Sequence, residues 1–114
     1  MELKERTKNL SLEVIKLIDR LPRNRVADVI AKQLLRAGTS IGANYRAACR
    51  ARSRADFISK MGIVEEEADE ARYWIELLIE SRLVPQGEVQ HLIEESDAVL
   101  GMTVSSIKTA RKNR

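Results

Sequence analysis

The sequence predicts an all-α protein that folds as an antiparallel, up-down-up-down four-helix bundle. Apolar residues recur at intervals of three and four along almost the whole chain, which is the period of an amphipathic helix. Only 2 Pro and 5 Gly interrupt the 114 residues. No segment shows the alternating β-branched pattern or the turn pairs of a β-hairpin. Four long helical segments joined by short links are typical of an antiparallel bundle.

The first half of the chain predicts two helices. The first spans about residues 3–20 and ends before Pro22, because the residue preceding proline is forced out of the α region. The second runs from about Asn24, a potential N-cap, to about Arg52. It contains the small-residue segment 37–43, which either breaks the helix or lets another helix approach closely. We favour the close approach.

The second half of the chain predicts two further helices. Ser53 is a suitable N-cap for a third helix, which the apolar spacing extends to about Arg82. Pro85 and Gly87 interrupt the pattern, and a fourth helix follows from about Glu88 to Ala110. We expect a single domain over residues 1–114, because chains of this length form one core.

Composition excludes several classes of protein. The chain is 44% hydrophobic and 32% charged, which argues against disorder, and aromatic residues make up only 4%. Base-stacking surfaces built from several rings are therefore not expected. No apolar run approaches the roughly 18 residues that cross a bilayer, and the N-terminus does not resemble a signal peptide. We expect a cytoplasmic protein that does not enter a membrane.

No catalytic, cofactor or metal site is expected. Glu88 and His91 have the Glu-x-x-His spacing of di-iron bundles, but His91 is the only histidine, so a second such motif cannot exist. Cys49 is the only cysteine, and no general base accompanies it in the sequence. The sequence also lacks a phosphate-binding glycine loop. We predict that the protein is not an enzyme and binds no cofactor.

Charge is distributed unevenly along the chain. The formal net charge is only +3, but residues 1–54 are strongly basic, residues 55–107 are strongly acidic, and the C-terminal segment 108–114 is basic again. The two halves either neutralise each other, within one chain or between chains, or leave a basic surface that attracts polyanions. The acidic run 65–70 holds five carboxylates, which predicts basic partners on a neighbouring helix or chain.

The arginines that follow position 45 are the sharpest polar feature. Arg46, Arg50 and Arg54 recur every four residues, which would align them in one stripe if the helix were continuous. Together with basic residues near the C-terminus they can contact phosphates. No sequence-reading motif accompanies them, so we expect non-specific binding. The predicted nucleic-acid contacts are Arg46, Arg50, Arg52, Arg54, Lys108, Arg111 and Lys112.

The segment around Tyr73 and Trp74 is apolar over more than one helix face. It either forms a central helix of the bundle or also packs against neighbouring subunits. The residues that we assign to a subunit interface are Tyr45, Glu66, Glu70, Tyr73 and Trp74.

Several segments of the chain together follow a known pattern. The segment 33–45 (QLLRAGTSIGANY) is similar to the pattern Q-x-x-R-A-x-x-S-I-x-x-N, and further likeness lies in RSRADF (52–57), EADE (67–70), YWIELL (73–78) and SSIKTA (105–110). On these segments the chain resembles the 23S rRNA intervening-sequence protein family of small four-helix bundles. The resemblance implies a ring-like homopentamer. It also implies kinship with an accessory protein of diversity-generating retroelements, which binds nucleic acid and a reverse transcriptase.

This sequence departs from the family where many members have Asn-Ile-Ala-Glu-Gly. Residues 44–48 read NYRAA, so an acid is lost and Arg46 is gained. Our first hypothesis is a homo-oligomeric bundle that binds RNA or DNA through its phosphates. The alternative is an adaptor that acts through a protein partner, such as a reverse transcriptase, with charged halves that pair between subunits.

Overall fold

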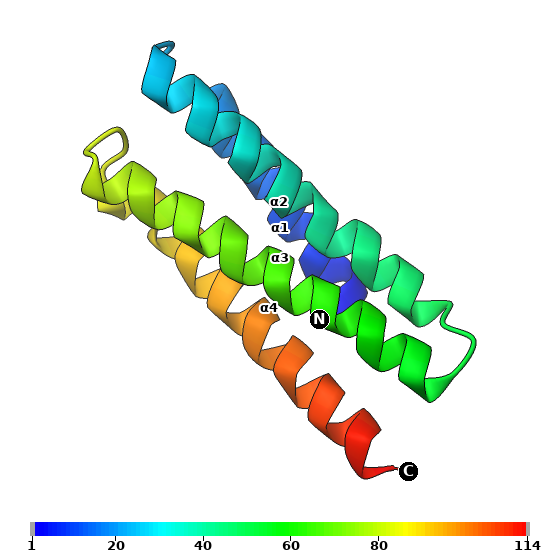
Figure 1. Cartoon of the computed structure of the whole chain (residues 1–114). Coiled ribbons are helices and arrows are strands. Elements are labelled where there is room, and N and C mark those ends of the chain that lie inside the picture. The colour runs from blue at the N-terminus through cyan, green and yellow to red at the C-terminus, as the bar shows by residue number, and fades with distance from the viewer. Residues whose placement is uncertain (1, 114) are drawn as a thin grey trace.

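The computed structural model describes residues 2–113, and this part of the chain forms four helices. They are α1 (Leu3–Asp19), α2 (Arg25–Cys49), α3 (Arg54–Glu80) and α4 (Gln86–Lys112). Successive helices run antiparallel and side by side, and α4 packs against α1 to close the bundle (Figure 1). The molecule measures 49 × 21 × 20 Å. The structure therefore confirms the predicted bundle. No helix within residues 2–113 is long and apolar enough to cross a membrane.

Side-chain caps fix the start of two helices as the sequence predicts. The Asn24 side chain accepts a hydrogen bond from the Ala27 N–H at 2.9 Å, and Ser53 Oγ accepts one from the Asp56 N–H at 3.0 Å. Each cap satisfies a backbone donor that the first turn would otherwise leave unpaired.

The predicted continuous stripe of arginines is wrong, because α2 ends three residues earlier than expected. The helix stops at Cys49, and Arg50 is its C-cap. The Asp56 carboxylate then accepts a hydrogen bond from the backbone N–H of Arg52, and the Ser53 cap starts α3. Arg50 and Arg52 consequently lie in a turn, and Arg54 begins a different helix.

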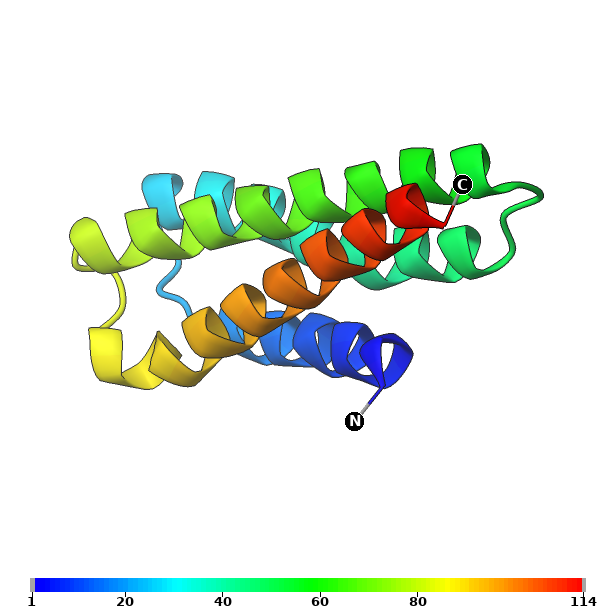
Figure 2. The same ribbon diagram turned by 90° about the horizontal axis from the view of Figure 1, so that it is seen from below.

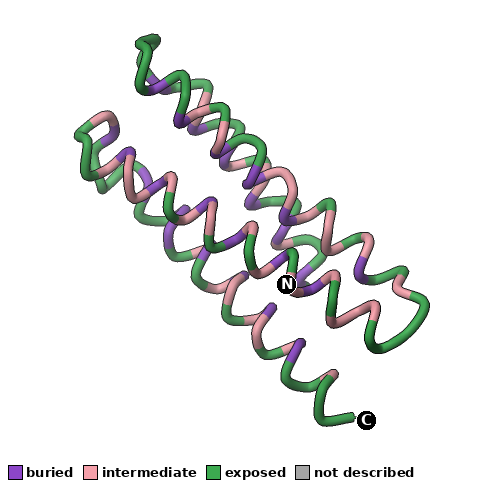
Figure 3. Tube along the Cα trace, viewed as in Figure 1, coloured by how far each residue is buried: buried purple, intermediate pink, exposed green. Residues whose placement is uncertain are grey.

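The core lies along the centre of the bundle, and one stripe of each helix faces it (Figure 3). Leu10, Val14 and Leu17 of α1 follow the predicted intervals of three and four residues, and all three are buried. The largest fully buried side chains of the other helices are Leu34, Ile41, Met61, Val64, Ile75, Leu78, Val89 and Val99.

Small residues bring α1 and α2 into close contact. A Cβ atom added at Gly38 would lie 2.9 Å from both γ-carbons of Val14, which is closer than real side chains approach. The Ser11 hydroxyl also donates to the Gly38 carbonyl across the two helices at 2.9 Å. Because α2 continues without interruption through Gly38 and Gly42, the structure confirms close approach rather than a break.

The turn between α3 and α4 places a non-glycine residue in the left-handed region. Arg82 has φ 62°, and it is the one non-glycine residue with positive φ among residues 2–113. The N–H groups of Arg82 and Leu83 donate to the carbonyls of Ile79 and Leu78, which is the Schellman pattern that ends a helix. Glycine usually occupies this position, because a Cβ atom is unfavourable there.

Replacing Arg82 with glycine is therefore expected to stabilise the protein. Relief of the left-handed strain outweighs the greater freedom of glycine in the unfolded chain, and we expect a gain of about 0.5–1 kcal/mol in the free energy of unfolding. Urea denaturation measures it. The control is Arg20→Gly at the C-cap of α1, where φ is −95°, and it should bring no gain. Equal effects of the two substitutions would contradict the assigned backbone geometry.

Candidate nucleic-acid interface

The antiparallel topology gathers the predicted phosphate-binding residues at one end of the bundle. The turn between α2 and α3 and the C-terminal end of α4 lie at the same end (Figures 1 and 2). We call this the basic end. Its seven predicted cations are all exposed: Arg46, Arg50, Arg52, Arg54, Lys108, Arg111 and Lys112. Residues about 60 positions apart in the sequence therefore lie at the same end of the bundle.

The cations of the basic end are not used in ion pairs. Among residues 2–113, carboxylates pair with arginines elsewhere, as in Arg6–Glu95 at 3.0 Å, but with none of the seven. One acid, Asp56, lies close to the turn. Its carboxylate accepts hydrogen bonds from Lys60 and from the Arg52 backbone, and these contacts hold the pKa of Asp56 below its ordinary value. Asp56 also interacts with the charge of Arg52, but none of the seven cations forms an ion pair among residues 2–113.

Helix dipoles explain part of this arrangement. Arg46 lies in the last turn of α2, and Arg111 and Lys112 lie in the last turn of α4. Cations are favourable there, because unpaired carbonyls make the C-terminal end of a helix partially negative. Arg50 and Arg52 lie in the turn and not in a last helical turn, so this effect does not explain their positions.

The acidic run has its basic partner within the chain, at an arginine that lies far from it in the sequence. Arg36 of α2 binds Glu67 at 3.2 Å and also Glu70, both on α3. The hydrogen bond from Arg36 to Glu70 raises the pKa of Arg36 above its ordinary value. The prediction of a partner on a neighbouring helix is confirmed for Glu67 and Glu70.

Other carboxylates of the acidic run have no ion-pair partner among residues 2–113. Glu65, Glu66 and Asp69 line a groove of about 330 Å³, whose remaining lining residues are Leu100 and Val104 of α4. The groove combines negative charge with an apolar floor, so it suits a basic, partly apolar segment.

Four of the five residues assigned to a subunit interface lie on α3. Tyr73 is 53% exposed and packs edge-on against the half-buried ring of Trp74, with 5.2 Å between ring centroids. Trp74 Nε1 donates to the Glu70 carboxylate at 3.1 Å. Glu66 and Tyr73 share one helix face with Glu70, because the three are spaced four and three residues apart.

Tyr45 lies away from that face, in a groove lined by Leu3 of α1 and Met102 of α4. Burial of the phenol and its hydrogen bond with Cys49 raise the pKa of Tyr45 to about 12. Tyr45 thus remains neutral at physiological pH. The structure does not bring it together with the aromatic pair on α3.

Two grooves between α1 and α2 were not expected from the sequence. The first, of about 460 Å³, contains three cations, Lys4, Lys8 and Arg46. The four-residue spacing of Lys4 and Lys8 already indicated that both lie on one face of the first helix. Their proximity to Arg46 depends on how the two helices pack.

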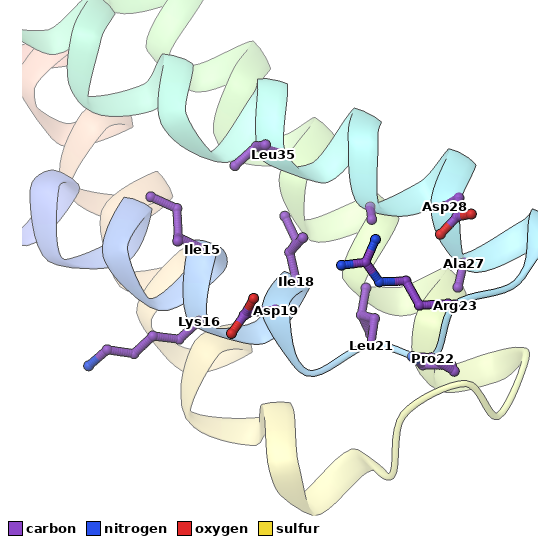
Figure 4. A pocket seen from close by; sticks show the side chains of 11 residues that line it. Ile15, Lys16, Ile18, Asp19, Leu21, Pro22, Arg23, Ala27, Asp28 and Leu35 are labelled. Carbon is purple, nitrogen blue, oxygen red and sulfur yellow. The ribbon is translucent and has the colours of Figure 1, made fainter.

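The second groove lies beside the turn between α1 and α2 (Figure 4). This turn is at the end of the bundle opposite the basic end (Figure 1). Ile15 and Ile18 point from α1 toward α2, and Leu35 points back from α2 (Figure 4). Lys16 extends away from them (Figure 4). Ile15 is 46% exposed and Leu35 is 39% exposed, so this groove presents apolar surface to solvent.

The two residues weighed for chemistry remain apart. His91 is exposed and lies 3.5 Å from Glu13, whereas Cys49 is exposed at the end of α2 beside Tyr45. Within residues 2–113, no group of three or more His, Cys, Asp or Glu side chains is arranged to hold a metal ion.

Fold and surface together define a small helical bundle with cations at one end that have no ion-pair partner among residues 2–113. The chain belongs to the 23S rRNA-intervening sequence protein family, whose model matches residues 1–105. A crystal structure from Bacteroides thetaiotaomicron VPI-5482, a protein of unknown function from the S23 ribosomal protein family, is similar with a TM-score of 0.88. Its sequence is 36% identical, over 94% of this chain and 99% of that chain. No curated protein matches. Neither the family nor this structure indicates an enzyme.

Proposed function

We propose that this protein is a non-enzymatic, homo-oligomeric bundle that binds RNA or DNA through backbone phosphates at its basic end. The observation that carries the proposal is the gathering of seven exposed cations at one end without ion-pair partners among residues 2–113. Lysines and arginines that contact phosphates release counterions from the nucleic acid, and this release drives sequence-independent binding.

Exposed apolar side chains support the oligomeric part of the proposal. Tyr73 and Ile63 are exposed on α3, and Leu12, Ile15 and Leu35 are exposed on α1 and α2. Assembly would remove this surface from water. The five-subunit ring implied by the family resemblance is the form that we propose.

The first test measures binding of the unmodified protein at several salt concentrations. Fluorescence anisotropy with labelled duplex DNA and labelled structured RNA is expected to show tight binding at low salt. The logarithm of the binding constant should fall with the logarithm of salt concentration at a slope of about −4 or steeper, as expected when several phosphates are neutralised. Absence of binding at low salt would overturn the proposal.

The second candidate function is that of an adaptor whose acidic surface binds a basic protein segment. It is favoured by the groove of Glu65, Glu66 and Asp69, which retains three carboxylates without ion-pair partners among residues 2–113. In a homo-oligomer this segment would be the basic end of another subunit. Light scattering distinguishes the two functions, because only the second predicts that reversing the charge of Arg50 dissociates the oligomer.

A further inference from the structure

The cationic groove between α1 and α2 lies next to the basic end and shares Arg46 with it. Lys4 and Lys8 supply its other two cations, and both are exposed. Its remaining lining residues are Thr7, Ser11, Thr39, Gly42 and Ala43, so no carboxylate contributes to it. None of the three cations has an ion-pair partner among residues 2–113.

The floor of the groove is made by residues without bulky side chains. A Cβ atom added at Gly42 would lie 3.5 Å from the carbonyl oxygen of Thr7, an ordinary van der Waals contact between α2 and α1. Lys4 and Lys8 are one helical turn apart, a rise of about 6 Å along α1. Arg46 faces them from α2. The cations therefore border the groove from both helices.

The hydroxyl groups in the groove do not compete with the cations as donors. Thr7 donates to the Lys4 carbonyl at 3.0 Å, and Thr39 donates to the Leu35 carbonyl at 2.7 Å. Ser11 donates to the carbonyls of Gly38 and Thr7. The side-chain donors left for a ligand are thus the two ammonium groups and the guanidinium, which select a ligand by its negative charge.

We propose that this groove holds backbone phosphates of a nucleic-acid strand that continues from the basic end onto the α1–α2 face. The inference rests on the proposed function and extends it. Arg46 connects the two surfaces, so a strand bound at the basic end meets Lys4 and Lys8 without crossing a carboxylate of the groove. One strand carries a charge about every 3.4 Å, so the length spanned by Lys4 and Lys8 engages about two phosphates.

The test removes the two lysines and compares the salt dependence of binding. Lys4→Gln combined with Lys8→Gln should reduce the magnitude of the salt slope by about 2 and weaken binding about tenfold at 0.1 M salt, as expected for two lost phosphate contacts. The matched control is Lys16→Gln combined with Lys32→Gln, which removes the same charge from exposed positions of α1 and α2 outside this groove. The control should bind with nearly the unmodified slope.

A second variant tests the groove without removing a cation. Ala43 is exposed and lines the groove, so Ala43→Glu places a carboxylate among the three cations and should weaken binding about tenfold at 0.1 M salt through repulsion of a phosphate. Circular dichroism and thermal unfolding verify that each variant folds. Inorganic phosphate at constant ionic strength should displace the strand only weakly.

The outcomes separate this inference from the proposed function. If the unmodified protein binds and loses binding when the arginines of the turn are reversed, but the lysine variant matches its control, the groove assignment is overturned and the proposed function stands. Full displacement by inorganic phosphate would show that the groove binds a free anion. It would also overturn the proposal that a nucleic-acid strand lies there. If the unmodified protein does not bind, both proposals are wrong.

Discussion

Reversing the charge of Arg50, Arg52 and Arg54 together to glutamate is expected to weaken binding of duplex DNA and structured RNA by about 100-fold or more at 0.1 M salt. The three side chains are exposed in the turn between α2 and α3 and at the start of α3, at the centre of the basic end. The salt slope should also become shallower by about 3, one for each lost phosphate contact. Anisotropy titrations at several salt concentrations measure both quantities.

We expect the three substitutions to leave the turn in place. The Asp56 carboxylate accepts its hydrogen bond from the backbone N–H of Arg52, which Arg52→Glu retains, whereas the favourable charge interaction between Arg52 and Asp56 is lost. Glutamate at position 54 lies in the first turn of α3, where a negative charge is favourable.

The matched control reverses three exposed arginines at the opposite end of the molecule. The turn between α1 and α2 is flanked by Arg20, Arg23 and Arg25. Reversing these three arginines changes the net charge by the same amount as the first variant. This control should retain most of the binding. A similar loss in both variants would show that only net charge matters, and it would contradict a binding surface at the basic end.

The second large effect is expected from Gly38→Leu, which should lower the free energy of unfolding by about 2–3 kcal/mol. The side chain would enter the space of Val14, whose γ-carbons already lie 2.9 Å from the first added carbon. Val14 is fully buried and branched at Cβ, so it has little room to move. α1 and α2 must separate, and the Ser11 bond to Gly38 is lost with them.

Gly62→Leu is the matched control for this prediction. Gly62 lies within α3, and a Cβ atom there would meet no other atom within 4 Å. Leucine is the better helix former, so Gly62→Leu should leave stability within about 0.5 kcal/mol of the original or raise it slightly. Urea denaturation compares the two variants. Equal stability would contradict the close packing of α1 against α2.

Helix identity and most helix starts follow from local sequence. The spacing of Leu10, Val14 and Leu17 predicts which face of α1 is buried, because that face is repeated every turn. Asn24 and Ser53 predict two helix starts, because each cap acts within three residues. The predicted end of α2 was wrong, because helical spacing alone does not show that the helix stops before Arg50.

The candidate site is only partly predictable in this way. The sequence identified the cations, but not that residues 46–54 and 108–112 lie at the same end as a groove on α1. Such proximity depends on the direction and packing of whole helices. The partner of the acidic run was missed for the same reason, because Arg36 is 31 residues from Glu67.

The sequence by itself determined the helical class, the core stripes and the two side-chain caps, since each depends on neighbours within a turn. The close approach at Gly38 was one of two alternatives until the packing of α1 against α2 decided it. Only the tertiary structure decided which charges are paired and which are free. Arg36 lies opposite the carboxylates of α3 and binds them, whereas Arg50 and Arg52 project from a turn with no carboxylate within ion-pair distance of their side chains among residues 2–113. Coulomb attraction depends on distance in space, and that distance is set by the packing of the four helices.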